Sequence, residues 1–241
     1  MSLSIDKSHS ALDHVGRMPV TIAICNLKGG CGKSTVALNL ASALASEARQ
    51  VCLVDADAQG TAAYCAEGGL LPVEYVSLVL GKDVQGWIRR VLALRADIAL
   101  IDAPPHAGDA TEAIIGLADL VLVPCTPSTA DILAAVKTIE LVRAARLHRT
   151  DRGPQCVLVP SKVDRRTASG REIEAALSQF GEPVGPVIRQ LSGFVDAFTM
   201  RQWIGNYAPN SPAHEDIANL ASYVKQTLDK TTIDKRSRKH G

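Results

Sequence analysis

The sequence predicts an α/β fold in which helices flank a doubly wound, mostly parallel sheet. Three observations predict it: short apolar runs without polar alternation, runs with helical spacing between them, and a glycine-rich stretch directly after the first apolar run. Unbroken apolar runs are typical of strands that are covered on both faces. The 241 residues, of which 46% are hydrophobic, suffice for one sizeable core, so a single domain is expected.

In the first half of the chain, the first strand leads into the glycine-rich loop and an Ala/Leu-rich helix that ends near Glu47. Apolar residues recur at helical spacing over 83–94, which predicts a second helix. Residues 57–82 are rich in Ala and Gly, and only a candidate strand over 73–80 stands out. Strands are expected over 20–26, 50–55 and 97–102.

In the second half, Ser128 is expected to begin a long helix that ends near His148. Asp131 follows Ser128 by three residues, in the pattern of a capping box. The alternation of strands with helices favours parallel pairing in the sheet. Further strands are expected over 119–125, 156–160 and 183–188, and further helices over 109–117, 167–180, 192–204 and 212–228.

The two ends of the chain differ in composition from the predicted domain, residues 19–228. We expect residues 1–18 to form a flexible leader, since they are polar, lack periodicity and lack the apolar segment of a secretory signal. Residues 229–241 are expected to form a basic tail. The stretch from Lys225 to the end holds six basic and two acidic residues, a net charge of +4.

The overall composition limits the partners of the chain. The formal net charge is only +1, so any affinity for nucleic acid must come from a local patch. Aromatic residues make up 4%, which argues against stacking on single strands. No apolar run approaches the ~18 residues of a membrane span, and no membrane partner is expected. The six cysteines form no C-x-x-C pair, which favours buried thiols in a reducing cytoplasm over a metal cluster.

Residues 28–35 have the features of a phosphate-binding loop between a strand and a helix. Glycines let successive backbone N–H groups face an anion without a Cβ clash. Lys33 is placed to reach the β- and γ-phosphates of a nucleotide, and the Ser34 hydroxyl to bind Mg²⁺. The expected nucleotide-binding residues are Lys28, Gly29, Gly30, Cys31, Gly32, Lys33, Ser34 and Thr35.

Two positions of this loop are unusual. The pattern G-x-x-x-x-G-K-[ST] has its first glycine where Leu27 stands, and Lys28 follows as a second lysine. Cys31 lies inside the loop, where amides that bind anions also favour a thiolate. A redox switch at Cys31 is therefore an alternative to the simpler role of a small residue at a variable position.

Acidic residues follow two of the expected strands. Asp55 and Asp57 follow the second strand, and Asp102 ends a later apolar strand. The carboxyl ends of parallel strands converge on the edge that carries the phosphate loop. Asp102 is suited to the role of the aspartate that holds Mg²⁺, either directly or through a water molecule. Of Asp55 and Asp57, one is suited to assist the metal shell and the other to orient the attacking water.

Together these motifs resemble the ParA/MinD family of deviant Walker A P-loop ATPases, and most of all its short ParA-type partition members. The resemblance spans about residues 19–228. Ala58 departs from it, because the family usually has proline there, but no functional group is lost. The matching stretches are 28–35, 54–60 and 100–105, with further matches over 124–128, 163–167 and 207–212.

The resemblance implies that ATP and Mg²⁺ bind, and that two subunits sandwich two ATP molecules face to face. Lys28 would then reach across to the partner's nucleotide and add a cation where charge builds in phosphoryl transfer. It implies catalytic roles for Lys28, Lys33 and Asp57. The implied metal-site residues are Ser34, Asp55 and Asp102.

Non-specific DNA is a further implied partner. Chromosomal partition ATPases often carry DNA-binding arginines in the C-terminal helix, and the matching stretch from His214 lacks them. Contacts with DNA must then come from elsewhere, and the affinity should fall steeply with salt. The candidates are Arg165, Arg166, Arg171, Arg189, Arg201, Lys225, Lys235, Arg236, Arg238 and Lys239.

The implied function is an ATPase that dimerises with ATP, coats nucleoid DNA in the bacterial cytoplasm, and positions a plasmid, a chromosome or a protein complex. A ParB-like protein or another cargo adaptor would stimulate hydrolysis. The alternatives are a MinD-like regulator that cycles on membranes, an iron–sulfur cluster carrier, and a small-molecule kinase or synthetase. The tail lacks aromatics after Tyr223, which argues against the first, and the cysteine spacing offers no convincing pair for the second.

Overall fold

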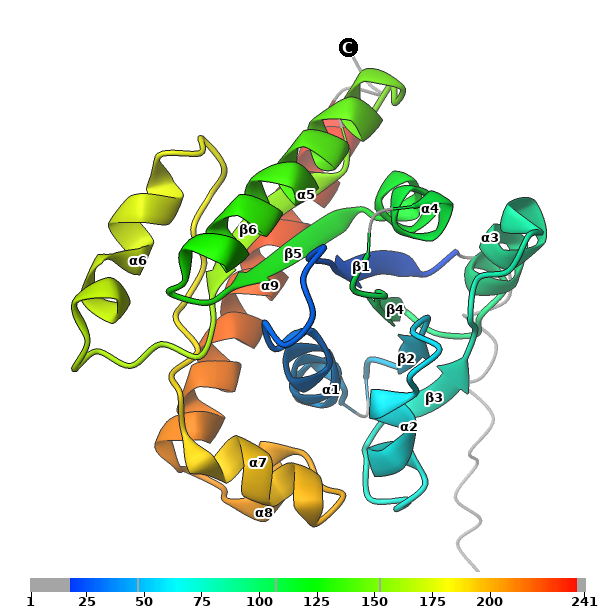
Figure 1. Ribbon diagram of the computed structural model, residues 1–241. Coiled ribbons are helices and arrows are strands. Elements are labelled where there is room, and N and C mark those ends of the chain that lie inside the picture. The colour runs from blue at the N-terminus through cyan, green and yellow to red at the C-terminus, as the bar shows by residue number, and fades with distance from the viewer. Residues whose placement is uncertain (1–17, 47, 107, 152, 238–241) are drawn as a thin grey trace, which may run out of the picture.

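The computed structural model describes residues 18–46, 48–106, 108–151 and 153–237, with the backbone alone over 231–237. Six strands form one sheet, and every pairing between neighbouring strands is parallel. The predicted doubly wound parallel sheet is confirmed (Figure 1). In sheet order, the strands are β3 (Glu74–Ser77), β2 (Val51–Asp55), β4 (Ile98–Asp102), β1 (Val20–Ile24), β5 (Leu120–Cys125) and β6 (Gln155–Pro160).

Helices cover both faces of the sheet and enclose two hydrophobic cores (Figure 1). One face carries α1 (Lys33–Leu44), α2 (Thr61–Ala66), α7 (Ser192–Thr199), α8 (Ile204–Tyr207) and α9 (Pro212–Ser237). The other face carries α3 (Val84–Leu92), α4 (Asp109–Leu117), α5 (Thr129–Leu147) and α6 (Ala168–Ser178). Within the described ranges, no helix combines the length and the apolar character that a membrane span requires.

The carboxyl edge of the sheet brings the chemically important strand ends together. Asp55 and Asp102 are register partners on β2 and β4, and Ile24 of β1 is the partner of Asp102 on its other side. Asn26, which follows β1, donates through Nδ2 to the Pro124 carbonyl of β5 at 2.7 Å. The predicted convergence of the loop and the strand-end carboxylates is therefore confirmed.

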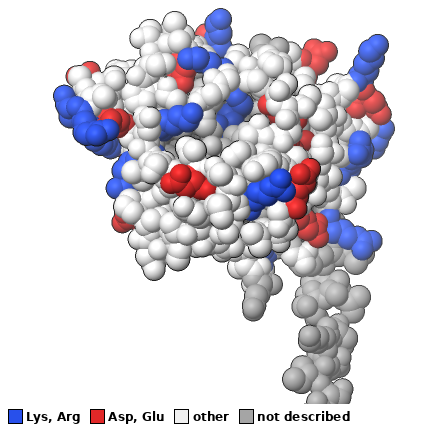
Figure 2. Space-filling model, turned by 60° about the horizontal axis from the view of Figure 1, so that its bottom comes forward, with Lys and Arg blue, Asp and Glu red and all other residues white. Residues whose placement is uncertain are grey.

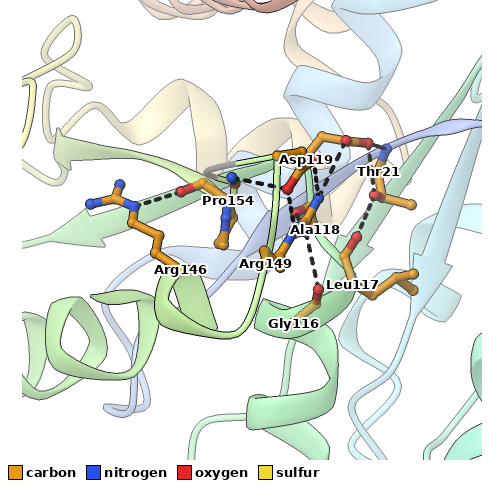
Figure 3. A network of polar contacts seen from close by, with 10 residues as sticks. Thr21, Gly116, Leu117, Ala118, Asp119, Arg146, Arg149 and Pro154 are labelled. Atoms are coloured by element: carbon orange, nitrogen blue, oxygen red, sulfur yellow. Dashed lines mark hydrogen bonds and ion pairs between the residues drawn. The ribbon is translucent and has the colours of Figure 1, made fainter. Parts of the chain in front are cut away.

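A polar network fixes the opposite, amino edge of the sheet (Figure 3). Asp119 Oδ2 accepts hydrogen bonds from the Thr21 backbone N–H at 3.0 Å and from the Thr21 hydroxyl at 3.1 Å. Arg149 donates through Nη1 to the carbonyls of Gly116 and Ala118, at 3.0 and 2.6 Å. The network joins the start of β1 to the α4–β5 turn and to the end of α5. The Arg149 guanidinium is therefore occupied by contacts within the fold.

Two segments that were expected to be regular differ in the structure. Residues 183–188 run beside β6 with only one bridge, at Val184, because Pro183 and Pro186 have no N–H to donate to a ladder. The helix expected over 192–204 is two helices, α7 and α8. Arg201 separates them with a left-handed φ of 55°, which ends the first helix.

Two further segments are more helical than expected. The ambiguous stretch holds α2, which follows Gly60 in a left-handed conformation with φ 63°. The helix expected to stop at 228 continues as α9 to Ser237, across the predicted boundary between the domain and the basic tail. That boundary remains a prediction, and most of the predicted leader, residues 1–17, lies outside the described residues.

Candidate nucleotide-binding site

The loop between β1 and α1 has the conformation that its glycines predict. Gly30 and Gly32 have left-handed φ values of 81° and 96°, which favour glycine. A Cβ on Gly32 would lie 2.8 Å from the Ser161 hydroxyl oxygen, so the space is closed to a side chain as well. The backbone can therefore approach an anion closely at this point.

The amino end of α1 is open to an anion. Gly32 is its N-cap and supplies no side-chain hydrogen bond, and the first turn holds no acidic residue. The first backbone N–H groups of a helix have no intrahelical partner, and the helix dipole favours negative charge there. The end of α1 is therefore suited to bind phosphate, as the sequence predicts.

The two lysines of the loop are held by different partners. Lys33 is buried, and its ammonium donates to the Lys28 carbonyl at 2.8 Å. The Lys28 ammonium forms an ion pair with the Asp131 carboxylate at the start of α5. The Lys28 side chain is 41% exposed, whereas that of Asp131 is 4% exposed. In this conformation Lys28 is bound to its own chain.

Hydrogen bonds to neighbouring residues hold Asp131 in place. Its Oδ2 accepts from the Thr126 hydroxyl at 2.5 Å, and its backbone N–H donates to the Ser128 hydroxyl at 3.2 Å. Burial raises the pKa of Asp131, but the hydrogen bonds from Lys28 and Thr126 outweigh it and hold the pKa below its ordinary value. The predicted capping box is thus half formed: Ser128 caps α5, while the Asp131 carboxylate binds Lys28 and Thr126.

Asp102 has the properties of a metal-binding carboxylate. It is buried, and neither of its carboxylate oxygens has a hydrogen-bond partner. Burial raises its pKa from an ordinary 3.8 to about 7, while the nearby Ser34 hydroxyl and Lys33 ammonium lower it in part. A buried carboxylate whose charge is only partly offset by a hydroxyl and an ammonium is a suitable ligand for a cation. Asp102 and Ser34 therefore fit Mg²⁺.

The rest of a magnesium shell would have to come from water and phosphate. Among the described residues, no three His, Cys, Asp or Glu side chains form a metal-binding group. Proteins usually hold Mg²⁺ with one or two carboxylates plus the phosphates of a substrate.

Asp55 and Asp57 lie next to Asp102 but are already engaged. Asp55 Oδ1 accepts from the Asp57 backbone N–H at 3.1 Å, and its Oδ2 accepts from the Tyr75 hydroxyl at 3.3 Å. Burial raises the pKa of Asp55. Asp57 Oδ1 accepts from the Gln59 backbone N–H at 3.0 Å, which shapes the turn before α2. Asp102 is therefore better placed than Asp55 for direct contact with a cation.

A pocket of about 440 Å³ opens beside the loop, between the ends of β1, β5 and β6. Lys28, Asp131 and Lys162 line it. Lys162 has a left-handed φ of 52°, and its ammonium donates to the Gly30 carbonyl at 2.7 Å. No pattern in the sequence pointed to Lys162, because a lone lysine after a strand is usually a surface residue.

Of the arginines that were expected to bind DNA, Arg165, Arg166 and Arg171 lie together around the start of α6, where Arg171 Nη1 donates to the Arg166 carbonyl at 2.9 Å. Carboxylates hold several of them, as in the pairs Arg165–Glu174 at 2.5 Å and Arg189–Asp216 at 2.7 Å. The Arg201 guanidinium lies over the Tyr64 ring, 4.4 Å from its centroid. Lys225 is exposed, the side chains of Lys235 and Arg236 are not described, and Arg238 and Lys239 lie outside the described residues.

All six cysteines are buried and free, as predicted. Cys31 in the loop makes a weak contact with the Lys28 carbonyl at 3.4 Å, and burial raises the pKa of its thiol. Redox-sensing cysteines are exposed and have a lowered pKa. The small-residue role of Cys31 is therefore the better supported of the two.

Asp102 predicts a pH dependence of stability without nucleotide or Mg²⁺. Its folded-state pKa of about 7 lies above the ordinary 3.8, so the folded chain holds a proton that the unfolded chain releases. The contribution of the Asp102 proton to stability is fully present below about pH 4 and is lost by about pH 7. Between these values the free energy of unfolding falls by up to ~1.4 kcal/mol per pH unit. Urea unfolding from pH 4 to 8 should show that Asp102→Asn falls less steeply than wild type. Parallel curves would contradict this assignment.

The fold and the loop define a class of protein: a P-loop nucleotide-binding protein with a parallel α/β sheet. Residues 22–200 match the family model described as the CobQ/CobB/MinD/ParA nucleotide binding domain. The chain belongs to this family. The resemblance that the loop and the strand-end aspartates indicated is confirmed.

Curated relatives and solved structures agree with this assignment. The chain is 31% identical over 167 residues to maintenance of carboxysome distribution protein A of Halothiobacillus neapolitanus, covering 68% of this chain and 76% of the relative. It is 29% identical over 242 residues to the chromosome-partitioning ATPase Soj of Thermus thermophilus, covering 84% and 94%. The fold matches MinD of Pyrococcus horikoshii, complexed with Mg-ADP, with a TM-score of 0.71 and 18% identity over 89% of this chain and 99% of that one.

Proposed function

We propose that the protein is an ATPase whose ATP-bound subunits form a sandwich dimer that binds DNA non-specifically and positions a cargo. One observation carries the proposal: a phosphate loop with a second lysine lies at the same sheet edge as the buried carboxylate of Asp102. A loop that only bound a nucleotide would need Lys33 alone. The second lysine provides a cation for a nucleotide outside its own loop.

Each residue of the site has a separate role in ATP hydrolysis. Lys33 and the amino end of α1 neutralise the phosphates in the same subunit, and Ser34 and Asp102 hold Mg²⁺. When bound, Mg²⁺ withdraws charge from the phosphate oxygens. Asp57 lies at the turn before α2 and orients the attacking water. Lys28 adds its charge to the partner's γ-phosphate, where negative charge builds in the transition state.

Lys28 links the nucleotide state to dimerisation. Two facing subunits without ATP would bring two lysines together, and the like charges would repel. The γ-phosphates neutralise them. In the single chain, the ion pair with Asp131 gives the Lys28 ammonium a partner. Dimerisation therefore exchanges a carboxylate of the same chain for a phosphate of the other subunit's nucleotide.

The names of the relatives indicate a class of cargo and a class of adaptor. One relative is named for carboxysome distribution and another for chromosome partitioning, so the proposed cargo is a large body in a bacterial cytoplasm that must be distributed. A ParB-like protein or another adaptor on that cargo would stimulate hydrolysis. Association with the nucleoid follows if the dimer binds DNA.

The proposed function is tested by DNA retardation in gels with ATP and with ADP. We expect retardation with ATP and Mg²⁺ only, lost as salt rises, because contacts with phosphates release counterions. Slow release of phosphate from ATP should accompany it. A protein that hydrolyses no ATP, or that sediments with anionic liposomes and ignores DNA, would overturn the proposal.

Asp131→Asn is expected to favour the dimer. The change removes the carboxylate charge that holds Lys28, and the amide oxygen can still accept from the Thr126 hydroxyl. Since Lys28 is well exposed, the ion pair should be worth about 0.5–1 kcal/mol, roughly a two- to fivefold change per subunit in the dimer dissociation constant. Sedimentation velocity with ATP would measure it. Thr126→Val is the matched control, because it disturbs the same carboxylate and keeps its charge. Equal or weaker dimerisation of Asp131→Asn would contradict the role of the ion pair.

A further inference from the structure

Most arginines of the described residues are engaged within the fold. Glu182 binds two of them, Arg143 and Arg146, and the network of Figure 3 uses Arg149. Arg165, Arg166 and Arg189 have carboxylate partners within 3.3 Å. An arginine that is paired with a carboxylate must give up that partner before it binds a phosphate, which costs about 0–1 kcal/mol for an exposed pair. These residues are therefore weaker candidates for binding a polyanion than an unpaired arginine.

The end of α3 is different. Arg89 and Arg90 lie in its last turn and Arg95 follows three residues after it, and all three are exposed. Within the described ranges, no ion pair involves any of them. The buried side of the same helix carries Trp87 and Val91, which pack into the core. The α3 basic face, defined as Arg89, Arg90 and Arg95, thus presents three free guanidinium groups within seven residues.

This face lies away from the nucleotide. α3 begins after β3, at the carboxyl edge of the sheet, and ends before β4, whose first residues lie at the amino edge. The last turn of α3 is therefore at the edge opposite the phosphate loop. Figure 2 shows Lys and Arg spread over one face of the molecule, where they are mixed with Asp and Glu. Two subunits that meet at their nucleotides would leave both basic faces exposed.

We propose that the α3 basic face binds the phosphate backbone of double-stranded DNA. Guanidinium groups bind phosphate oxygens through paired N–H donors, and three exposed ones within seven residues suit a duplex backbone. A lipid bilayer is disfavoured, because no large apolar side chain of α3 is exposed for insertion. Single strands are disfavoured by the scarcity of aromatics, at 4% of the chain. This inference rests on the proposed function. It assigns DNA binding to the α3 basic face in place of the ion-paired arginines.

The experiment compares Arg89→Gln/Arg90→Gln/Arg95→Gln with Arg165→Gln/Arg166→Gln, whose arginines are ion-paired. Fluorescence anisotropy would measure binding of the full chain to a labelled DNA duplex of random sequence, with ATP and Mg²⁺, over a range of salt. We expect the triple α3 variant to lose about tenfold or more in affinity, with a salt slope lower by about three per subunit. The control should lose less than about threefold. ATP-dependent dimerisation and melting temperature should match wild type in both.

The conservative variant Arg89→Lys/Arg90→Lys/Arg95→Lys should recover most of the affinity, because it keeps the charge. Unchanged DNA binding in the triple Gln variant, or an equal loss in the control, would overturn the α3 assignment and leave the proposed function intact. The α3 assignment would also be overturned if the triple Gln variant lost binding to phosphatidylglycerol vesicles while its binding to DNA stayed unchanged. If wild type binds no DNA with ATP, the proposed function itself fails.

Discussion

Replacing Lys28 with Gln is expected to abolish ATP-dependent dimerisation and to reduce turnover on the order of 10³-fold, as removal of a cation supplied in trans does. The Gln side chain is polar and one atom shorter than that of Lys, and it carries no charge that could neutralise a γ-phosphate. ATP should still bind, because Lys33 and the open end of α1 are untouched. Light scattering with ATP and with ADP, together with phosphate release, would measure both effects.

The control for Lys28→Gln is Lys82→Gln, which removes a lysine that is exposed and far along the chain from the loop. It should dimerise and hydrolyse ATP as wild type does. A Lys28→Gln protein that still dimerises and turns over at the normal rate would show that Lys28 is only a surface lysine of the loop.

The second large effect is expected at Asp57. Asp57→Ala should bind ATP and dimerise but hydrolyse ATP about 10²–10⁴-fold more slowly, because the group that orients water is lost. The dimer should then persist, and DNA retardation with ATP should last longer than with wild type. Phosphate release and the lifetime of the dimer after dilution would measure this.

Asp57→Asn separates chemistry from structure at this position. Its amide oxygen can still accept from the Gln59 N–H and keep the turn before α2, but it is a much weaker base. Both variants should be slow if Asp57 acts on the water. Rapid turnover in either variant would refute the role, whereas slow turnover in Asp57→Ala alone would assign Asp57 to the turn.

The sheet and the phosphate side of the site were predictable because local patterns determine them. Unbroken apolar runs marked β1, β2, β4 and β5, and parallel pairing then placed Asp55 and Asp102 as neighbours. The loop was predictable for the same reason, since its glycines and Lys33 are contiguous in sequence.

The partners of the loop could not be predicted, because they come from distant parts of the chain. The sequence indicated Asp131 as a capping residue, and only the packing of α5 against the loop pairs it with Lys28. Lys162 meets Gly30 across 132 residues of sequence. The same limit applies to the arginines: composition counts Arg165 and Arg189 as basic, while the fold supplies each with a carboxylate.

Mixing two inactive variants tests most directly whether Lys28 acts on the partner's nucleotide. In a mixed dimer of Lys28→Ala and Asp57→Ala, the site on the Lys28→Ala subunit has its own Asp57 and receives Lys28 from the partner. Turnover should therefore reappear, approaching about a quarter of the wild-type rate when half of the dimers are mixed and each has one complete site. The assay is made at concentrations where differently tagged subunits co-purify with ATP. Mixed dimers that form but stay inactive would contradict the action of Lys28 across the interface.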